Sequence, residues 1–197
     1  PAELADRILR NKTYFKRNSG GVTFSGGEPL LQSKFIIEVC KILKKNHIHV
    51  ALDTAGVGNG NYAEILHYVD LVLLDVKHTN PIAYKDLTGH EMDDGLEFIK
   101  ALNESNTSVW IRQVVVPGLM DNDDYLDSLV DFLKNINNIE KIEFLPYHKL
   151  GSEKYIKLGI EYPYRDLEEM DRDRCSRLYD RFMEKYQKMR EMEKDHN

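Results

Sequence analysis

Cysteine is scarce in this sequence of 197 residues, which contains only Cys40 and Cys175. Two cysteines placed so far apart are too few to hold an iron–sulfur cluster, so we expect no iron–sulfur ligand and no cysteine-based catalytic residue in this chain. Two unpatterned cysteines are also typical of a reducing compartment rather than of a disulfide scaffold. The sequence therefore predicts a cytoplasmic protein.

Several other features are absent. No apolar run approaches the roughly 20 residues that a membrane-spanning helix needs, and no signal peptide leads the chain. The net charge of −6 argues against a nucleic-acid partner, because phosphate binding needs a basic surface. No zinc-binding histidine pair, nucleophile elbow or phosphate-binding glycine loop is present. We therefore predict neither a membrane nor a nucleic-acid partner.

Apolar strands alternate with helical stretches along the chain, which indicates βα units and a parallel sheet. We predict one α/β domain over residues 1–197, in which residues 165–197 form a C-terminal helix and tail. Five strands are too few for a closed eight-stranded barrel, so the pattern fits an open partial barrel or a doubly wound sheet. The predicted strands are Val22–Ser25, His49–Asp53, Leu71–Val76, Ser108–Val116 and Lys141–Leu145. The predicted helices are Ala2–Lys16, Gln32–Asn46, Tyr62–Tyr68, Asp93–Asn103, Asp123–Asn135 and Arg165–Met189.

The most informative segment runs from the first predicted strand into Gly26-Gly27-Glu28-Pro29. Glycines at the carboxyl end of a strand let a ligand meet bare backbone. Glu28 and Pro29 suit the first turn of a following helix, because a carboxylate is stabilised there and proline loses no hydrogen bond.

Polar side chains stand at or near the carboxyl end of each strand, where parallel βα folds bind their ligands. We expect these residues to converge: Glu28, Asp53, Asp75, Lys77, Arg112 and His148. Each has a plainer alternative: Asp53-Thr54 as a helix cap, and Lys77 or His148 as solvated loop residues. Arg112 is different, because a guanidinium inside an apolar strand needs an anionic partner. Asp53 and Asp75 are the candidates.

Five motifs occur in an order that resembles the glycyl-radical-enzyme activases of the radical S-adenosylmethionine superfamily, most closely the pyruvate formate-lyase activating type. The resemblance extends from near the start of the chain to about Tyr162. The motifs are Gly26-Gly27-Glu28-Pro29, Leu52-Asp53-Thr54-Ala55-Gly56, Leu73-Leu74-Asp75-Val76-Lys77, Val109–Gly118 and Leu145–Gly151.

The resemblance implies an incomplete TIM-like barrel of parallel strands with outer helices. It also implies an oxidoreductase in which a [4Fe–4S] cluster, held by a C-x-x-x-C-x-x-C loop, chelates S-adenosylmethionine. A 5′-deoxyadenosyl radical then takes a hydrogen atom from a glycine of the partner enzyme. Implied partners are a glycyl radical enzyme, such as pyruvate formate-lyase, and an electron donor such as flavodoxin or ferredoxin.

The same resemblance assigns roles to individual residues. Gly26, Gly27 and Glu28 match the motif that meets the methionyl amino group. Lys77, Arg112 and His148 match positions near the methionyl and nucleoside parts of the ligand. A monovalent-cation site is implied beside the methionyl carboxylate, formed by Asp53, Thr54, Asp75 and the backbone carbonyl of Leu73.

The chain departs from the family pattern because the cysteine loop and the first βα unit are absent. Since Pro1 is not a start residue, we expect a truncated activase that is inactive without the cluster. Loss of the first strand would expose the edge of Val22–Ser25, so we also expect self-association through that edge or its coverage by the N-terminal helix.

Two other functions compete with this hypothesis. One is a non-catalytic module that binds S-adenosylmethionine or a partner protein, and the other is an unrelated partial-barrel enzyme such as a metal-independent lyase. The ordered motifs argue against the second. The gene sequence that precedes Pro1 would distinguish the non-catalytic binding module from an activase.

Overall fold

The computed structural model describes residues 1–162 and 164–195, and it divides the chain into two compact units. The first unit comprises Pro1–Arg112 and Ile136–Ile142, and the second comprises Gln113–Asn135 and Glu143–Asn197. The expectation of one domain over residues 1–197 stays a prediction.

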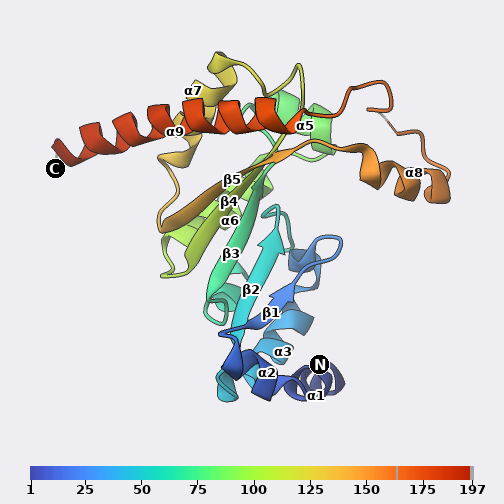
Figure 1. The fold of residues 1–197 in the computed structure, drawn as a ribbon. Coiled ribbons are helices and arrows are strands. Elements are labelled where there is room, and N and C mark those ends of the chain that lie inside the picture. Colours follow the sequence, from blue (N-terminus) through green and yellow to red (C-terminus); the bar gives the residue numbers. More distant parts are fainter. Residues whose placement is uncertain (163, 196–197) are drawn as a thin grey trace. The chain divides into compact units, whose positions relative to one another are not determined.

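A five-stranded parallel sheet runs through the fold, and its strands follow one another in chain order (Figure 1). This order, with helices between the strands, confirms the predicted partial-barrel α/β class. The register pairs Phe24 with Leu52 and Asp53 with Leu73, so successive strands end close together. The strands are β1 (Gly21–Phe24), β2 (His49–Thr54), β3 (Leu71–Val76), β4 (Ser108–Val115) and β5 (Ile139–Pro146).

Helices of the first unit pack on one another and on the sheet. α3 contacts β2, α1 and α4, while α4 contacts α6. The helical spacing of apolar residues in α3 explains this contact, because Ile36, Val39 and Leu43 are all buried. The elements are α1 (Ala2–Leu9), α2 (Lys12–Arg17), the 3₁₀ helix η1 (Pro29–Gln32), α3 (Ser33–Lys45), α4 (Tyr62–Leu66), α5 (Pro81–Thr88) and α6 (Asp93–Asn103).

The second unit is built around the packing of α7 on α9. Its helices are α7 (Asp123–Leu133), η2 (Lys149–Gly151), α8 (Ser152–Leu158) and α9 (Arg172–Asp195). Leu178, Phe182 and Met189 are buried along one side of α9, as their spacing predicts. Phe182 is fully buried, and its ring lies 5.0 Å from that of Phe144 and 5.7 Å from that of Tyr186.

Two predicted helices differ markedly from the structure, and a further helix was missed. The N-terminal helix is two helices, because the first ends at Leu9 and Asn11 precedes the second. The long C-terminal helix begins at Arg172 rather than at Arg165, so Leu167 lies before it. Helix α5 was not predicted, although Asn80-Pro81 is a start signal: Asn80 Oδ1 accepts from the N–H groups of Ile82 and Ala83.

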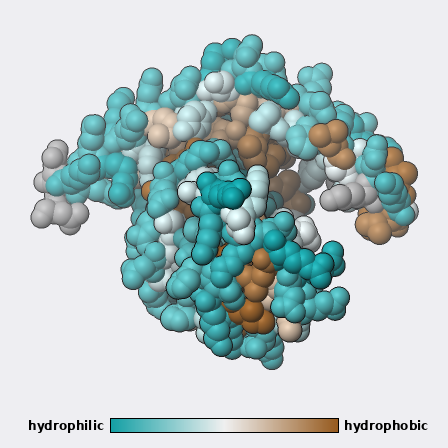
Figure 2. Space-filling model, turned by 60° about the horizontal axis from the view of Figure 1, so that its bottom comes forward, coloured by the Kyte–Doolittle hydropathy of each residue, from teal (hydrophilic) through white to brown (hydrophobic). Residues whose placement is uncertain are grey.

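Helix α8 was also not predicted, and its surroundings are unusually apolar at the surface. Leu150, Ile156 and Leu158 are each more than two-thirds exposed, and Ile160 is about half exposed. Figure 2 shows this apolar area at the right of the view. Separately, no helix in residues 1–162 and 164–195 is long and apolar enough to cross a bilayer.

Gln113 is a fully buried polar residue of β4, and its amide is satisfied within the second unit. Tyr125 Oη donates to Gln113 Oε1 at 2.7 Å, and Gln113 Nε2 donates to the carbonyl of Val114 at 2.8 Å. Burial raises the pKa of Tyr125, so its hydroxyl keeps its proton and remains a donor. These bonds explain how β4 carries an amide inside the core.

Candidate functional site

The candidate site lies on the half-buried face of the sheet, at the carboxyl ends of β2 and β3 and beside Arg112 in the middle of β4. Along β3 and β4, buried residues alternate with residues that are only half-buried. Asp75 and Arg112 belong to the half-buried set, and Asp53 near the end of β2 is likewise half-buried. Because successive side chains of a strand point to opposite faces, this alternation places the charged groups on the open face.

Arg112 joins both aspartates that the sequence proposed as its partners. Its Nε donates to Asp75 Oδ1 at 2.8 Å, and its Nη2 lies 2.7 Å from the same oxygen. Nη2 also donates to Asp53 Oδ1. The three side chains are 21–23% exposed, so an unpaired guanidinium here would be costly. The prediction that Arg112 needs an acidic partner is confirmed.

Lys77 completes a charge-balanced cluster. Its Nζ lies 3.0 Å from Asp75 Oδ2, so Asp75 is shared between two cations. Burial alone would lower the pKa of Arg112, but the carboxylates of Asp75 and Asp53 outweigh it and raise that pKa above its ordinary value. The cluster of Asp53, Asp75, Lys77 and Arg112 therefore holds two fixed charges of each sign.

The turn between β1 and Glu28 presents bare backbone beside this cluster. Gly26 has φ +127°, a conformation that side chains of L-residues rarely adopt. A Cβ atom added at Gly26 or Gly27 would meet nothing within 4 Å, so open space surrounds both glycines. Ser25, which precedes them, donates from Oγ to Asp53 Oδ2 at 3.3 Å. This hydroxyl links the turn to the charged cluster.

Glu28 has a different surrounding from the one that the sequence suggested. It is the residue before η1 rather than part of its first turn, and its Oε1 accepts from Leu30 N–H at 3.1 Å. The same oxygen accepts from Thr54 Oγ1 at 2.6 Å, and Oε2 accepts from Ala55 N–H at 2.9 Å. Pro29 is the first residue of η1, as its fixed φ favours.

Leu73 and His148 are the other two residues that the sequence predicted for the site. Leu73 lies on β3, two residues before Asp75, and pairs in register with Asp53 of β2. His148 belongs to the second unit, where its Nδ1 accepts from Leu150 N–H at 3.4 Å at the start of η2. The structure therefore gathers Asp53, Asp75, Lys77 and Arg112 and sets the glycine turn beside them. The convergence of His148 with them stays a prediction.

Sequence reasoning assigned no role to three groups at this site. The hydroxyl of Ser25 and the backbone N–H of Ala55 both bind site carboxylates. His78 follows Lys77, and burial lowers the pKa of its imidazole, whose Nδ1 accepts from Asn80 N–H at 3.0 Å. Ser25 and His78 gave a usable signal, because each is a polar residue at or just after the end of a predicted strand.

Neither cysteine fits an iron–sulfur ligand. Cys40 in α3 is fully buried, and burial raises the pKa of its thiol to about 12. Cys175 in α9 is also buried, and burial raises its pKa as well. A cluster needs several thiolates together. Among the described residues, no group of three or more His, Cys, Asp or Glu side chains is placed to hold a metal ion.

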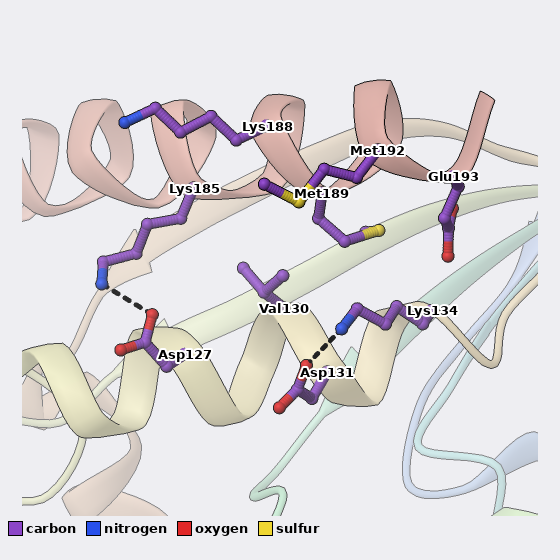
Figure 3. A pocket seen from close by; sticks show the side chains of 9 residues that line it. All are labelled: Asp127, Val130, Asp131, Lys134, Lys185, Lys188, Met189, Met192 and Glu193. Carbon is purple, nitrogen blue, oxygen red and sulfur yellow. Dashed lines mark hydrogen bonds and ion pairs between the residues drawn. The ribbon is translucent and has the colours of Figure 1, made fainter. Parts of the chain in front are cut away.

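A groove of about 630 Å³ lies between α7 and α9 of the second unit (Figure 3). Val130 and Met189 supply apolar surface to it, and ion pairs lie along its sides. Lys185 pairs with Asp127 at 2.6 Å and Lys134 pairs with Asp131 at 2.5 Å. These pairs are surface contacts that contribute little to stability.

Comparisons with known proteins agree with the motifs at the strand ends. Residues 1–133 match the family described as the radical SAM superfamily. The chain is 49% identical over 176 residues to a pyruvate formate-lyase-activating enzyme of Clostridium pasteurianum, covering 89% of this chain and 74% of that one. It is 41% identical over 184 residues to a protein of the same name from Staphylococcus aureus strain USA300, covering 90% and 73%.

A solved structure supports the fold. A crystallised domain of a pyruvate-formate lyase-activating enzyme from Bacteroides vulgatus superposes with a TM-score of 0.64 at 22% identity. The match covers 83% of this chain and 94% of that domain. The chain spans about three quarters of the length of its curated relatives from Clostridium and Staphylococcus.

Proposed function

Because this chain belongs to the pyruvate formate-lyase-activating enzymes of the radical SAM superfamily, we propose that its charged cluster and glycine turn hold the amino-acid end of S-adenosylmethionine. In this family S-adenosylmethionine and a [4Fe–4S] cluster supply the chemistry that generates a glycyl radical on pyruvate formate-lyase or a related enzyme. Cys40 and Cys175 do not fit that cluster, so the roles below concern ligand binding alone.

The observation that carries this proposal is the pairing of a balanced charge cluster with exposed backbone. The methionyl end of the ligand is a zwitterion, with an ammonium and a carboxylate on one carbon. Lys77 and Arg112 supply cations for the carboxylate, and Arg112 offers the planar fork that suits it. Gly26, Gly27 and Glu28 supply carbonyl oxygens and negative charge for the ammonium. We assign His148 to the nucleoside side of the ligand.

We also propose a monovalent-cation site at Asp53, Thr54, Asp75 and the carbonyl of Leu73. In the structure the guanidinium of Arg112 lies against Asp53 and Asp75. When Arg112 pairs with a ligand carboxylate, the two aspartates need another counter-ion at close range. A cation there would separate like charges, since the ligand carboxylate would otherwise face both aspartates.

Binding is tested by titrating S-adenosylmethionine into the chain and following backbone amide signals by NMR. We expect weak affinity, because the chain offers no iron to anchor the ligand, with signal shifts at Gly26, Gly27 and Ala55. The control ligand is 5′-methylthioadenosine, which lacks the amino-acid end and should leave the two glycine signals unmoved. Shifts confined to other regions, or sub-micromolar affinity, would contradict the proposal.

Activity is tested by incubating the chain anaerobically with pyruvate formate-lyase, S-adenosylmethionine and a reduced flavodoxin or ferredoxin, the electron donors that we propose. We expect no glycyl-radical signal by electron paramagnetic resonance from this chain alone, because its thiols are buried. A radical signal at the level of a complete activase would refute this.

A non-catalytic binding module is the second candidate, and the two buried cysteines are the observation that favours it. The gene distinguishes the two functions. A C-x-x-x-C-x-x-C motif encoded in frame before Pro1 decides for an activase, and a start codon next to Pro1 decides for the module.

We further propose a cytoplasmic location and self-association through β1. This strand lies at one edge of the sheet, and α1 packs on α3. An unpaired edge presents backbone donors and acceptors to a second chain. Sedimentation equilibrium should then show a mass that rises with concentration, whereas a monomer at all concentrations would argue against the pairing.

A further inference from the structure

Helices α7 and α9 lie side by side and run in the same direction. Arg181 of α9 pairs with Asp123 of α7, and one turn further along both helices Lys185 pairs with Asp127 at 2.6 Å. Each pair joins residues 58 positions apart, so the two helices keep one register along their contact. This register places Met189 and Met192 of α9 beside the last turn of α7.

The groove between α7 and α9 begins where the ion pairs between the two helices end. Among the described residues, no ion pair joins the helices beyond Lys185 and Asp127. Asp131, in the next turn of α7, pairs with nearby Lys134 instead. Val130, Met189 and Met192 therefore line this part of the groove, and their side chains point into the space between the helices (Figure 3).

The charges around the groove are balanced except at one position. Lys185 and Lys134 are neutralised by carboxylates of α7, and Glu193 accepts from Arg190 at 3.4 Å. Lys188 is exposed, and in the part of the chain that the structure describes it forms no ion pair. The groove thus combines apolar surface with an ammonium group that no carboxylate neutralises.

A third helix suits this shape better than a small molecule does. The space between two helices that run side by side is a groove into which the side-chain ridge of another helix packs. Met192 is 65% exposed, and methionine is flexible enough to adapt to the side chains of a partner. An ammonium group beside apolar surface favours a partner that carries a carboxylate next to its apolar face.

We propose that the α7–α9 groove is a docking site for an amphipathic helix of another protein. The apolar face of that helix would cover Met189 and Met192, and an acidic residue at its edge would pair with Lys188. The groove belongs to the second unit, and none of its residues is part of the charged cluster in the first. This inference therefore does not rest on the proposed function.

The test uses two synthetic helical peptides of about 18 residues, a length at which a helix can form. Both carry leucine at helical spacing, and they differ only beside that apolar face, where one has glutamate and the other lysine. The chain is labelled at its methionine methyl groups and titrated by NMR. We expect saturable shifts at Met189 and Met192, while Met92 and Met120, which do not line the groove, stay unmoved.

The charge of the peptide separates docking from general attraction. The chain has a net charge of −6, so attraction to the chain as a whole would favour the lysine peptide. A preference for the glutamate peptide would therefore come from the groove. Lys188→Glu should weaken the glutamate peptide about fivefold and strengthen the lysine peptide by a similar factor.

Two further variants complete the test. Lys34→Glu is the matched control, because it makes the same change in net charge at an exposed lysine of α3 and should leave both affinities unchanged. Met192→Gln keeps the length of the side chain but makes it polar. It should weaken both peptides about fivefold, since less apolar surface is buried in the complex.

Four results would overturn the proposal. The first is the absence of saturable shifts at Met189 and Met192 with millimolar glutamate peptide. The second is an affinity of the unsubstituted chain for the lysine peptide that equals or exceeds its affinity for the glutamate peptide. The third is the same effect of Lys34→Glu and Lys188→Glu. The fourth is a shift of both methyl signals when the chain is diluted without peptide, which would show that a second copy occupies the groove.

Discussion

The Nε atom of Arg112 donates to Asp75 Oδ1 at 2.8 Å across the open face of the sheet, from one strand to its neighbour. Asp53 completes the arrangement from the strand beyond. Because all three side chains are about four-fifths buried, removal of any one of them leaves a charge that water screens only in part.

Arg112→Gln should therefore destabilise the chain by about 1–3 kcal/mol, since it leaves two carboxylates facing each other. Arg112→Lys should lose less, because it keeps the charge but not the fork. Urea unfolding measures both. The control is Arg112→Gln in an Asp75→Asn background, where the cost should shrink; an undiminished cost would show that the pair is not coupled.

The response to monovalent cations should depend on Arg112. In the unsubstituted chain the guanidinium already neutralises Asp53 and Asp75, so exchange of choline chloride for potassium chloride should not move the thermal midpoint. In Arg112→Gln the two carboxylates regain a need for a counter-ion, and potassium should raise the midpoint. A larger response in the unsubstituted chain would contradict this competition between guanidinium and cation.

Gly26 and Gly27 form a matched pair of substitution sites. Gly26→Ala should cost about 1–3 kcal/mol of stability, because φ +127° is strained for alanine. Gly27→Ala should cost far less, since φ at Gly27 is not in that region and neither new Cβ atom meets another atom within 4 Å. Chemical denaturation of both variants measures the difference. An equal loss of stability in the two variants would mean that the backbone of the turn adjusts to alanine at Gly26 without strain.

Cys40 should make stability fall at alkaline pH. Burial raises the pKa of its thiol from 9.0 to about 12, so the thiol contributes fully below pH 9 and the contribution is lost as pH rises towards 12. Between these values, unfolding free energy should fall by about 1.4 kcal/mol per pH unit relative to Cys40→Ala. Cys40→Ala removes the titration of this thiol and keeps all the others. If the unfolding free energies of Cys40→Ala and the unsubstituted chain fall in parallel between pH 9 and 12, the thiol of Cys40 is not the cause.

The sequence predicted the parallel strands and most helices because their apolar periods are regular and their lengths ordinary. It also predicted that Arg112 needs an acidic partner, since a guanidinium inside an apolar strand is costly unless a carboxylate neutralises it. It did not predict that Glu28 is bound by Thr54 and Ala55. Hydrogen bonds between two loops depend on the distance between those loops in three dimensions. Local sequence patterns do not predict that distance.

Helix α8 shows a second limit of the sequence. Its seven residues, Ser152–Leu158, are too few for a helical period to stand out, and Ile156 and Leu158 are exposed rather than buried. The start of α9 was misplaced for a related reason. Residues 165–171 are as charged as the helix that follows, so composition gives no boundary there.

The alternation along β4 has a consequence for the evolution of this strand. Arg112 belongs to the open face, and its neighbour Gln113 is enclosed and bonded to Tyr125. Insertion or deletion of a single residue upstream in β4 would exchange their places, burying a guanidinium and exposing the amide. A length change within Ser108–Val115 would thus destabilise the fold by burying the guanidinium, and it would also remove Arg112 from the charged cluster. Surviving variants of this strand should differ by substitution alone.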